Sequence, residues 1–458
     1  MLNRKRYIPV RSISAKGKFL VAALRTAFSF RRFLGGSDWD TELPGHHEDP
    51  LHMRPVELLH MAHKYYYRII NKASEGNDIH GLIQKNREKL RLPDHFVAEQ
   101  SITLSAGGDL MPYYCITKEA CSSLWDECGD FFFGADIATA NLETPLDLTR
   151  KASAVPEVML KNMYFNSSSE MFGVYSGSGK FKGYQVLSVA NNHSLDQGES
   201  GLLHTLKFLE EKSIPYCGAA KREDLRDNFP IIEKNGIRIA FLAATFSLNA
   251  LTAPAGKEWL VNHLNLNTPH PDIQLLIHQS GLARERGADL IVAHLHMGLA
   301  YQPYPSNRTV ETMHRICEQT GIDILLGGHP HNPQPFEFYS YTDPFSKKAK
   351  QSSIIYSLGD FVAYDIFKWC HLPMMLKFTI SKGESGTCVT NLETKLAYMQ
   401  AEVQKGRVIN LKLRDFSGLL KDSSSLDPDS LKEFRELEEF AREFLLTGNV
   451  VSFLAQEV

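Results

Sequence analysis

The sequence predicts an α/β protein, and two features of residues 101–380 carry that prediction. Short apolar runs alternate with segments whose apolar residues recur at helical spacing, which is typical of a sheet packed against helices. Most of these runs also end in polar side chains, as strands do at the ligand-binding edge of an α/β sheet. The expected helices include 201–212 and 308–320. The expected strands are residues 102–106, 137–141, 186–190, 237–244, 290–294, 322–326, 354–358 and 374–380.

Composition narrows the class of protein. The chain has 458 residues, of which 43% are hydrophobic and 22% charged, as in ordinary globular proteins. Its net charge of −3 argues against a nucleic-acid binder, which is usually strongly basic. Seven cysteines without paired spacing do not form a disulfide framework and favour a reducing compartment, so a cytoplasmic location is expected.

We expect three regions along the chain. Residues 1–98 form a basic arm followed by a helical extension, because the apolar residues between 55 and 92 recur at helical spacing. Residues 99–400 form the main domain. Residues 401–458 are expected to be a helical C-terminal segment, in which 429–446 is an amphipathic helix.

The first 36 residues contain nine lysines and arginines and no acid. Their most apolar part, residues 19–33, is interrupted by arginines and is too short to span a bilayer. A solvated, partly disordered arm is the preferred interpretation. The alternative is a basic amphipathic arm that makes peripheral contact with an anionic membrane surface.

Side chains suited to metal binding follow five of the expected strands. Because the carboxyl ends of neighbouring parallel strands share one edge of a sheet, we expect these side chains to form one site. In chain order they are Asp109, Glu143, Asn192 with His193 and Asp196, His294 with His296, and His329 with His331.

Carboxylate, carboxamide and imidazole groups together suit a divalent ion such as manganese, iron or zinc. The set contains no thiolate, which argues against a structural zinc site. A carboxylate that bridges two ions would hold them roughly 3.5–4 Å apart. His294 and His296 point to the same face of their strand, since side chains alternate with period two. We expect His294 to be a hydrogen-bonded core residue and His296 to be the ligand.

The chain resembles the CapA/PgsA (poly-γ-glutamate capsule biosynthesis) family, a branch of the calcineurin-like metallophosphoesterase superfamily. The resemblance covers roughly residues 101–380 and is carried by seven segments: 104–111 (LSAGGDLM), 140–146 (ANLETPL), 187–198 (LSVANNHSLDQG), 214–219 (IPYCGA), 296–298 (HMG), 328–335 (GHPHNPQP) and 356–361 (YSLGDF). It implies a four-layer α/β/β/α metallophosphatase-like sandwich that holds one or two divalent ions: manganese, iron, zinc, magnesium or calcium. It implies as metal ligands Asp109, Glu143, Asn192, His296, His329 and His331.

The resemblance also implies two catalytic residues: His193 as the acid/base residue, and Asp196, which orients its ring or shares in proton transfer. The chain departs from the superfamily pattern at Met111, where phosphoesterases have a histidine ligand, so one ion has a ligand fewer. It also has Glu143 in place of an aspartate, Met297 in place of a tryptophan, and Asp360 in place of an asparagine.

Three functions fit these residues. The first is a hydrolase of an anionic peptide-like (poly-γ-glutamate-like) or phosphorylated substrate, which uses a metal-bound water with His193 as acid/base. The second is a metal-dependent epimerase that removes a Cα proton from a peptide residue. The third is a non-catalytic accessory subunit of a complex for capsule or polymer synthesis and export, in which the site binds carboxylate-rich chains.

Overall fold

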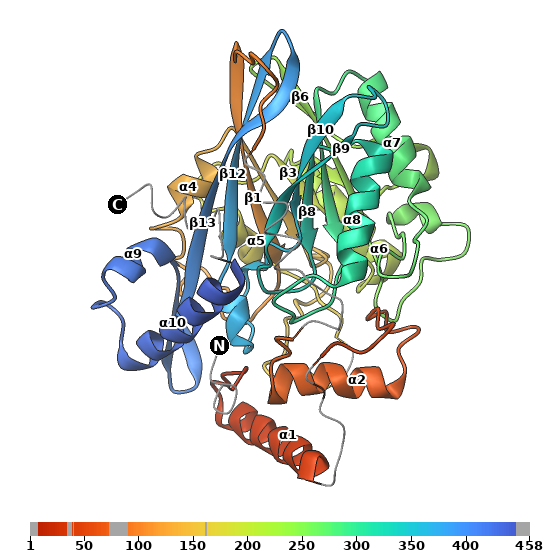
Figure 1. The fold of residues 1–458 in the computed structure, drawn as a ribbon. Helices are drawn as coiled ribbons and strands as arrows, with labels where there is room; N and C mark the ends of the chain where they lie inside the picture. The colour runs from red at the N-terminus through yellow and green to blue at the C-terminus, as the bar shows by residue number, and fades with distance from the viewer. Residues whose placement is uncertain (1–7, 34–38, 40, 73–89, 161–162, 446–458) are drawn as a thin grey trace.

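Two β-sheets lie face to face at the centre of the molecule (Figure 1). The structure is a computed structural model, and it describes residues 8–33, 39, 41–72, 90–160 and 163–445. The first sheet has the order β14-β13-β12-β1-β2-β3-β4, with β11 beside β1. Its strands are β1 (Gln100–Leu110), β2 (Ile137–Leu142), β3 (Val186–Ser188), β4 (Tyr216–Cys217), β11 (Asp360–Val362), β12 (Met374–Gly383), β13 (Gly386–Gln404) and β14 (Arg407–Asp415).

The second sheet has the order β5-β6-β7-β8-β10-β9. Its strands are β5 (Ile231–Lys234), β6 (Ile237–Thr245), β7 (Leu290–His296), β8 (Ile324–Gly328), β9 (Phe336–Thr342) and β10 (Ala349–Ile355). Strands β2, β7 and β8 are buried along their whole length, because each lies in a parallel part of a sheet that is covered on both faces. Their unbroken apolar runs follow from that burial.

Helices cover the outer faces of both sheets. Helix α4 contacts β1, β2 and β12 on one side, and α7 and α8 contact β6 and β9 on the other (Figure 1). The helices of this body are α4 (Gly129–Phe133), α5 (Ser169–Tyr175), α6 (Gly198–Glu211), α7 (Gln274–Glu285) and α8 (Asn307–Thr320), with short 3₁₀ helices at Glu223–Leu225, Glu258–Leu260 and Lys368–His371. The expected four-layer α/β/β/α arrangement is therefore confirmed.

The N-terminal region packs on the lower end of this sandwich. It contains α1 (Ala15–Phe33), α2 (Pro55–Ala62) and a π-helical turn, η1 (His63–Tyr67). Two features favour the start of helix α2. A proline occupies its first position, and the Glu57 side chain accepts from the Arg54 N–H at 2.6 Å. Residues 15–33 are helical, so the preferred expectation of a partly disordered arm is wrong for them. Residues 1–7, 34–38, 40 and 73–89 lie outside the described residues.

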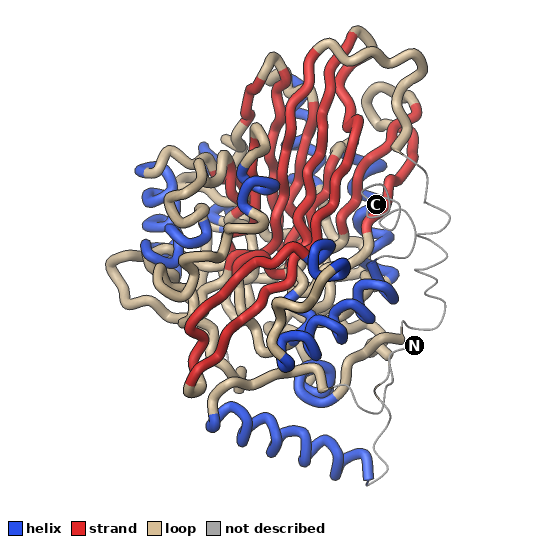
Figure 2. The backbone as a smooth tube through the Cα atoms, turned by 90° about the vertical axis from the view of Figure 1, so that its left-hand side faces the viewer, coloured by secondary structure: helices blue, strands red, loops and turns tan. Residues whose placement is uncertain are grey.

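Two other expectations differ from the structure. The expected strand at 354–358 ends at Ile355, and after Gly359, which has a φ of +73°, the chain enters the separate strand β11. The C-terminal segment begins as a strand: β14 pairs with β13, and only then do α9 (Phe416–Lys421), α10 (Pro428–Phe440) and a π-helical turn (Ala441–Leu445) follow. Figure 2 shows the β13–β14 ribbon extending away from the other strands. None of the helices in the described ranges has the length and hydropathy needed to span a membrane.

Candidate metal centre

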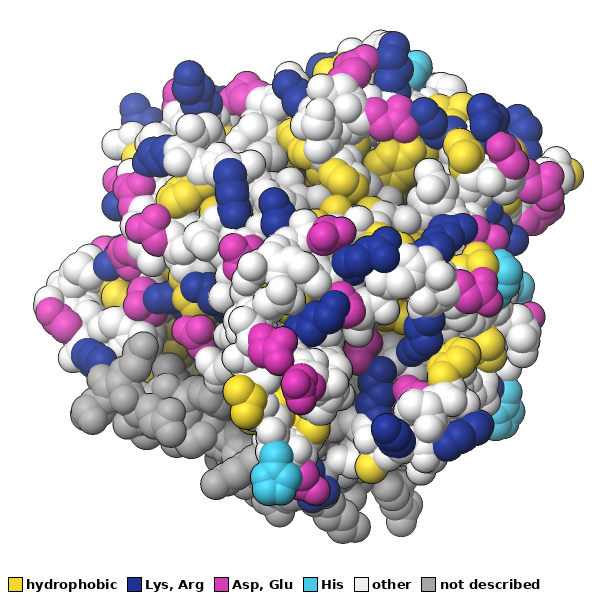
Figure 3. Space-filling model, turned by 90° about the horizontal axis from the view of Figure 1, so that it is seen from above, with side chains coloured by type: hydrophobic (Ala, Val, Ile, Leu, Met, Phe, Trp, Pro, Cys, Tyr) yellow, Lys and Arg dark blue, Asp and Glu magenta, His cyan; other side chains and the backbone are white. Residues whose placement is uncertain are grey.

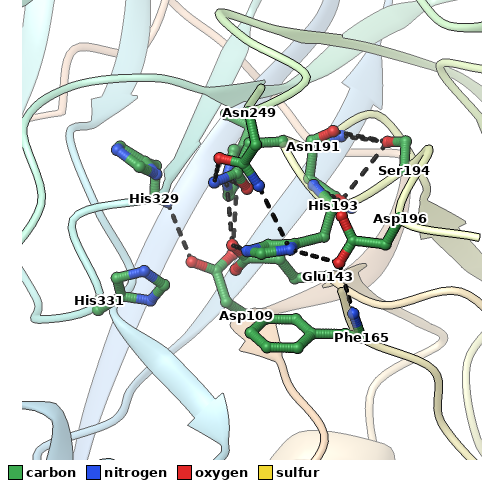
Figure 4. A network of polar contacts seen from close by, with 12 residues as sticks. Asp109, Glu143, Phe165, Asn191, His193, Ser194, Asp196, Asn249, His329 and His331 are labelled. Carbon is green, nitrogen blue, oxygen red and sulfur yellow. Dashed lines mark hydrogen bonds and ion pairs between the residues drawn. The ribbon is translucent and has the colours of Figure 1, made fainter. Parts of the chain in front are cut away.

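Strand ends from both sheets place the expected ligands at one edge of the sandwich. Asp109 lies near the end of β1, and Glu143 directly follows β2. His296 ends β7 in the other sheet, and His329 directly follows β8. The sheets face each other, so residues far apart in sequence meet there (Figure 4).

Two glycines make this close approach possible. A Cβ atom on Gly108 would lie 1.8 Å from the carbonyl oxygen of Gly359. A Cβ atom on Gly328 would lie 2.7 Å from Asp109 Oδ1. Only glycine fits at these positions, since any side chain would collide with the backbone or with the ligand carboxylate.

The ligand atoms form two groups that share Glu143. Glu143, His296 and His329 form one group, and Asp109, Glu143 and His331 form the other. Within each group the candidate ligand atoms all lie within 4.8 Å of one another. A carboxylate common to two groups of ligands is the arrangement expected of a pair of neighbouring ions.

Asn192 belongs beside the first group. His296 Nε2 lies 2.9 Å from Asn192 Oδ1 and 3.4 Å from Glu143 Oε1, so two oxygens converge on that nitrogen. On the other side of the ring, Asn141 donates to Asp109 Oδ1 at 2.8 Å and lies 3.2 Å from His296 Nδ1. The structure thus brings all six expected ligands together. Asn141, which was not expected at the site, holds two of them in place.

The residues present fit a divalent ion. Both carboxylate oxygens of Glu143 are buried, and no hydrogen-bond donor among the described residues reaches them. Neither ring nitrogen of His329 makes a hydrogen bond within the described residues, and Nε2 lies 3.5 Å from the Glu48 carboxylate. Burying a polar atom without a partner is costly, so unpaired atoms of this kind point to a group that binds them. An ion surrounded by Glu143, His296 and His329 would supply that partner.

Charge in the site is unbalanced, which also favours a cation. Burial and the nearby Glu143 raise the pKa of Asp109 to about 6. Burial alone would lower the pKa of His331, but Asp360, Glu143 and Asp109 outweigh it and raise that pKa to about 10. Asp360 Oδ1 lies 2.9 Å from His331 Nδ1 and orients the ring. Three buried carboxylates, those of Asp109, Glu143 and Asp360, thus lie in one cluster, and positive charge close by would stabilise their ionised forms.

His193 and Asp196 form a pair beside the shared carboxylate. Asp196 Oδ2 lies 2.7 Å from His193 Nδ1 and accepts from the Phe165 N–H at 2.6 Å. The imidazole stacks on the Phe165 ring with centroids 4.1 Å apart, and its Nε2 lies 3.9 Å from Glu143 Oε1 (Figure 4). Burial opposes the charged form of His193, but Asp196 outweighs it and raises the pKa. One nitrogen is therefore held by Asp196 while the other faces the ligands.

His294 lies apart from the ligand groups. Its Nε2 lies 2.8 Å from Thr139 Oγ1 between the two sheets, and burial lowers its pKa to about 3. Neither group of ligand atoms includes it. The structure thus places His294 in the core and His296 at the site, as the sequence predicts.

Sequence reasoning missed Glu48, which comes from the N-terminal region. Its Oε2 accepts from the Ala300 N–H at 2.6 Å and lies 3.5 Å from His329 Nε2. Its other oxygen pairs with Lys64, whose side chain is fully buried. No local signal marks Glu48, because its partners are distant in sequence. Asp360 could have been found, since it follows an expected strand as the other candidates do.

Comparison with known proteins shows a family that this chain matches. Residues 103–365 match the family model described as "Bacterial capsule synthesis protein PGA_cap". The chain is 29% identical over 268 residues to "Capsule biosynthesis protein CapA" of Bacillus anthracis, a match that covers 57% of this chain and 60% of that protein. It is 25% identical to "PGA biosynthesis protein CapA" of Bacillus subtilis over 58% of this chain and 64% of that protein.

A further relative, over a shorter stretch, and a solved structure are also similar. The chain is 26% identical over 187 residues to a Mycobacterium tuberculosis protein named "Probable polyglutamine synthesis accessory protein", covering 39% of this chain and 44% of that protein. The solved structure is the calcineurin-like phosphoesterase YfkN of Bacillus subtilis, with 13% identity, 74% of this chain and 99% of that chain covered, and a TM-score of 0.37. No conclusion follows from a score that low. The family match spans more than half of this chain and includes every expected ligand, and the chain therefore belongs to the bacterial capsule synthesis protein family PGA_cap.

Proposed function

We propose that this protein is a metal-dependent hydrolase of the CapA type, which cleaves an anionic peptide-like (poly-γ-glutamate-like) or phosphorylated substrate. The observation that carries the proposal is the position of Glu143. Its unpaired, buried carboxylate is shared by two groups of ligand atoms and lies 3.9 Å from His193 Nε2. A proton-transfer residue thus borders the place where ions would bind.

The six ligand residues would hold the ions, and Glu143 belongs to both groups of ligand atoms. The chemistry supplied by divalent ions at such a site is polarisation of a carbonyl or phosphoryl oxygen and a lower pKa for a coordinated water. His193 would move a proton through Nε2, because Asp196 holds Nδ1 and stabilises the imidazolium form. Phe165 fixes the plane of the ring by stacking on it and fixes Asp196 through its backbone N–H.

The test is the variant His193→Ala, compared with His204→Ala. His204 makes the same kind of pair, with its Nδ1 2.8 Å from Asp147 Oδ1, but it belongs to neither group of ligand atoms. Turnover of a phosphodiester and of poly-γ-glutamate is measured after loading with manganese or zinc, and metal content is measured by elemental analysis. We expect His193→Ala to lose at least about 100-fold in turnover with its metal content retained, whereas His204→Ala stays active. Full turnover in His193→Ala would exclude this role.

A second candidate is an accessory protein of polymer synthesis, which the name of the Mycobacterium tuberculosis relative favours. In that case the metal-loaded protein would be inert on both substrates and would bind poly-γ-glutamate through the same ligands. Exchange of Cα protons in D₂O without chain cleavage would instead support an epimerase. These outcomes are mutually exclusive with hydrolysis, so one set of assays separates the three functions.

A further inference from the structure

Helix α1 is fixed on the body by one of its faces. Val21 and Phe28 are buried, and Arg25 donates to the carbonyl oxygens of Tyr66 and Tyr67 at 3.0 and 2.9 Å. The Glu157 carboxylate accepts from the N–H groups of residues 13 and 14 at the start of the helix, at 2.6 and 2.9 Å. A carboxylate there also suits the positive end of the helix dipole. The orientation of α1 is therefore set by specific contacts.

The opposite face of α1 is apolar and faces outward. Phe19 is 73% exposed and Phe30 is 62% exposed. Ala23 and Thr26, also exposed, lie between them at spacings of four, three and four residues, which places all four on one side of the helix. A helix on a protein surface normally turns polar residues outward. This outward stripe, Phe19–Ala23–Thr26–Phe30, has two exposed aromatic rings at its ends and no function in the fold described above.

Positive charge flanks the stripe. Lys16 and Lys18 are exposed, and the helix contains no acidic residue. Lys18 also lines a groove between α1 and residues 8–12, and no carboxylate lines that groove. The cationic residues that line the groove are Arg11, Lys18 and Arg25. Its large apolar lining residues are Ile8, Val10 and Val21. The surface thus combines exposed aromatic side chains with cations.

Other exposed apolar residues lie in the same region of the chain. Seven of the sixteen large apolar side chains that are exposed in the described residues fall between residues 8 and 59, including Leu58 and Leu59 of α2. Figures 1 and 2 both place α1 at the lower extremity of the molecule. The opposite end, seen in Figure 3, has acidic and basic side chains interspersed.

We propose that the outward face of α1 binds the surface of a bilayer that contains anionic lipids, with the helix lying in the plane of the interface. Apolar side chains enter the headgroup region while lysines contact anionic headgroups, which is how a basic amphipathic helix binds a membrane. A second copy of the chain fits less well. An isologous pair of α1 helices would bring lysines of the two copies together with no acid on either helix to offset them.

Vesicle flotation of the full chain tests the proposal. Vesicles of phosphatidylcholine mixed with phosphatidylserine are compared with vesicles of phosphatidylcholine alone. We expect binding to the anionic vesicles only, weakened by added salt because headgroup attraction is screened. The variant Phe19→Ser/Phe30→Ser and the variant Lys16→Glu/Lys18→Glu are each expected to weaken binding by about tenfold or more. An acid in the first turn favours the helix, so the charge variant keeps α1 folded.

Matched controls come from other surfaces. Tyr114→Ser removes an aromatic ring that is 71% exposed, and Lys207→Glu reverses an exposed charge on α6. Both controls are expected to bind vesicles like the wild type. Absence of binding, or equal binding to neutral vesicles, overturns the proposal. So does loss of binding in the controls. A dimer that the double Phe variant converts to a monomer, without vesicle binding by the wild type, would assign the stripe to a second copy instead.

Discussion

Replacement of Glu48 by glutamine is expected to destabilise the protein strongly. Glu48→Gln keeps an oxygen that can accept from the Ala300 N–H. It removes the only negative charge that pairs with the fully buried Lys64 ammonium among the described residues. Leaving one member of a buried ion pair without its partner costs about 3–5 kcal/mol. The double variant Glu48→Gln/Lys64→Met removes both charges, so we expect it to recover most of that loss.

Urea unfolding followed by circular dichroism, in buffer with a chelator, measures these changes without the contribution of bound metal. Asp126→Asn is the control, because Asp126 pairs with Lys180 at 2.7 Å with both side chains about half exposed. A surface pair of this kind contributes less than about 1 kcal/mol. If Glu48→Gln cost no more than Asp126→Asn, or if the double variant were less stable than the single one, the inference of a buried pair would be wrong.

The same pair predicts a dependence on pH. Burial alone would raise the pKa of Glu48, but the Lys64 ammonium outweighs it and holds the pKa below its ordinary value. A carboxyl with a depressed pKa contributes stability that is present above the unfolded-state pKa of about 4.3 and is lost as the pH falls through the folded-state value. The difference in unfolding free energy between wild type and Glu48→Gln should therefore be constant near neutral pH and shrink below about pH 4.

Two further predictions concern the ligand cluster. Gly108→Ala is expected to lose at least about 2–3 kcal/mol of stability, because its Cβ would be overpacked against the Gly359 carbonyl. Gly173→Ala is the control: its Cβ would have no neighbour within 4 Å, so the urea midpoint should stay unchanged or rise. A stable Gly108→Ala protein with normal metal content would contradict the close approach. Removal of metal by chelation should lower the melting temperature, and an ion present at 100 times its dissociation constant should restore about 2.7 kcal/mol. Glu143→Gln should show no such response to metal, and a wild-type melting temperature that ignores both chelator and metal would refute the site.

Local sequence patterns were enough to predict eight of the described strands and most of the site. Asp109, Glu143 and His329 could be found because each follows a buried apolar run, and parallel strands bring their ends to one edge of a sheet. Strand β13 was not expected, because its partially exposed residues do not alternate regularly.

The sequence by itself determined which chemical groups this protein gathers, since apolar periodicity and polar strand ends are properties of short segments. Only the tertiary structure decided which groups meet. His294 and His296 point to the same face of their strand, because side chains alternate along it with period two. Their roles differ because His294 contacts Thr139 of the opposite sheet, whereas His296 contacts Asn192. Glu48 reaches His329 across 281 residues of sequence, held by its pair with Lys64. Such contacts depend on how distant segments pack, and that information is not present in any local stretch of the chain.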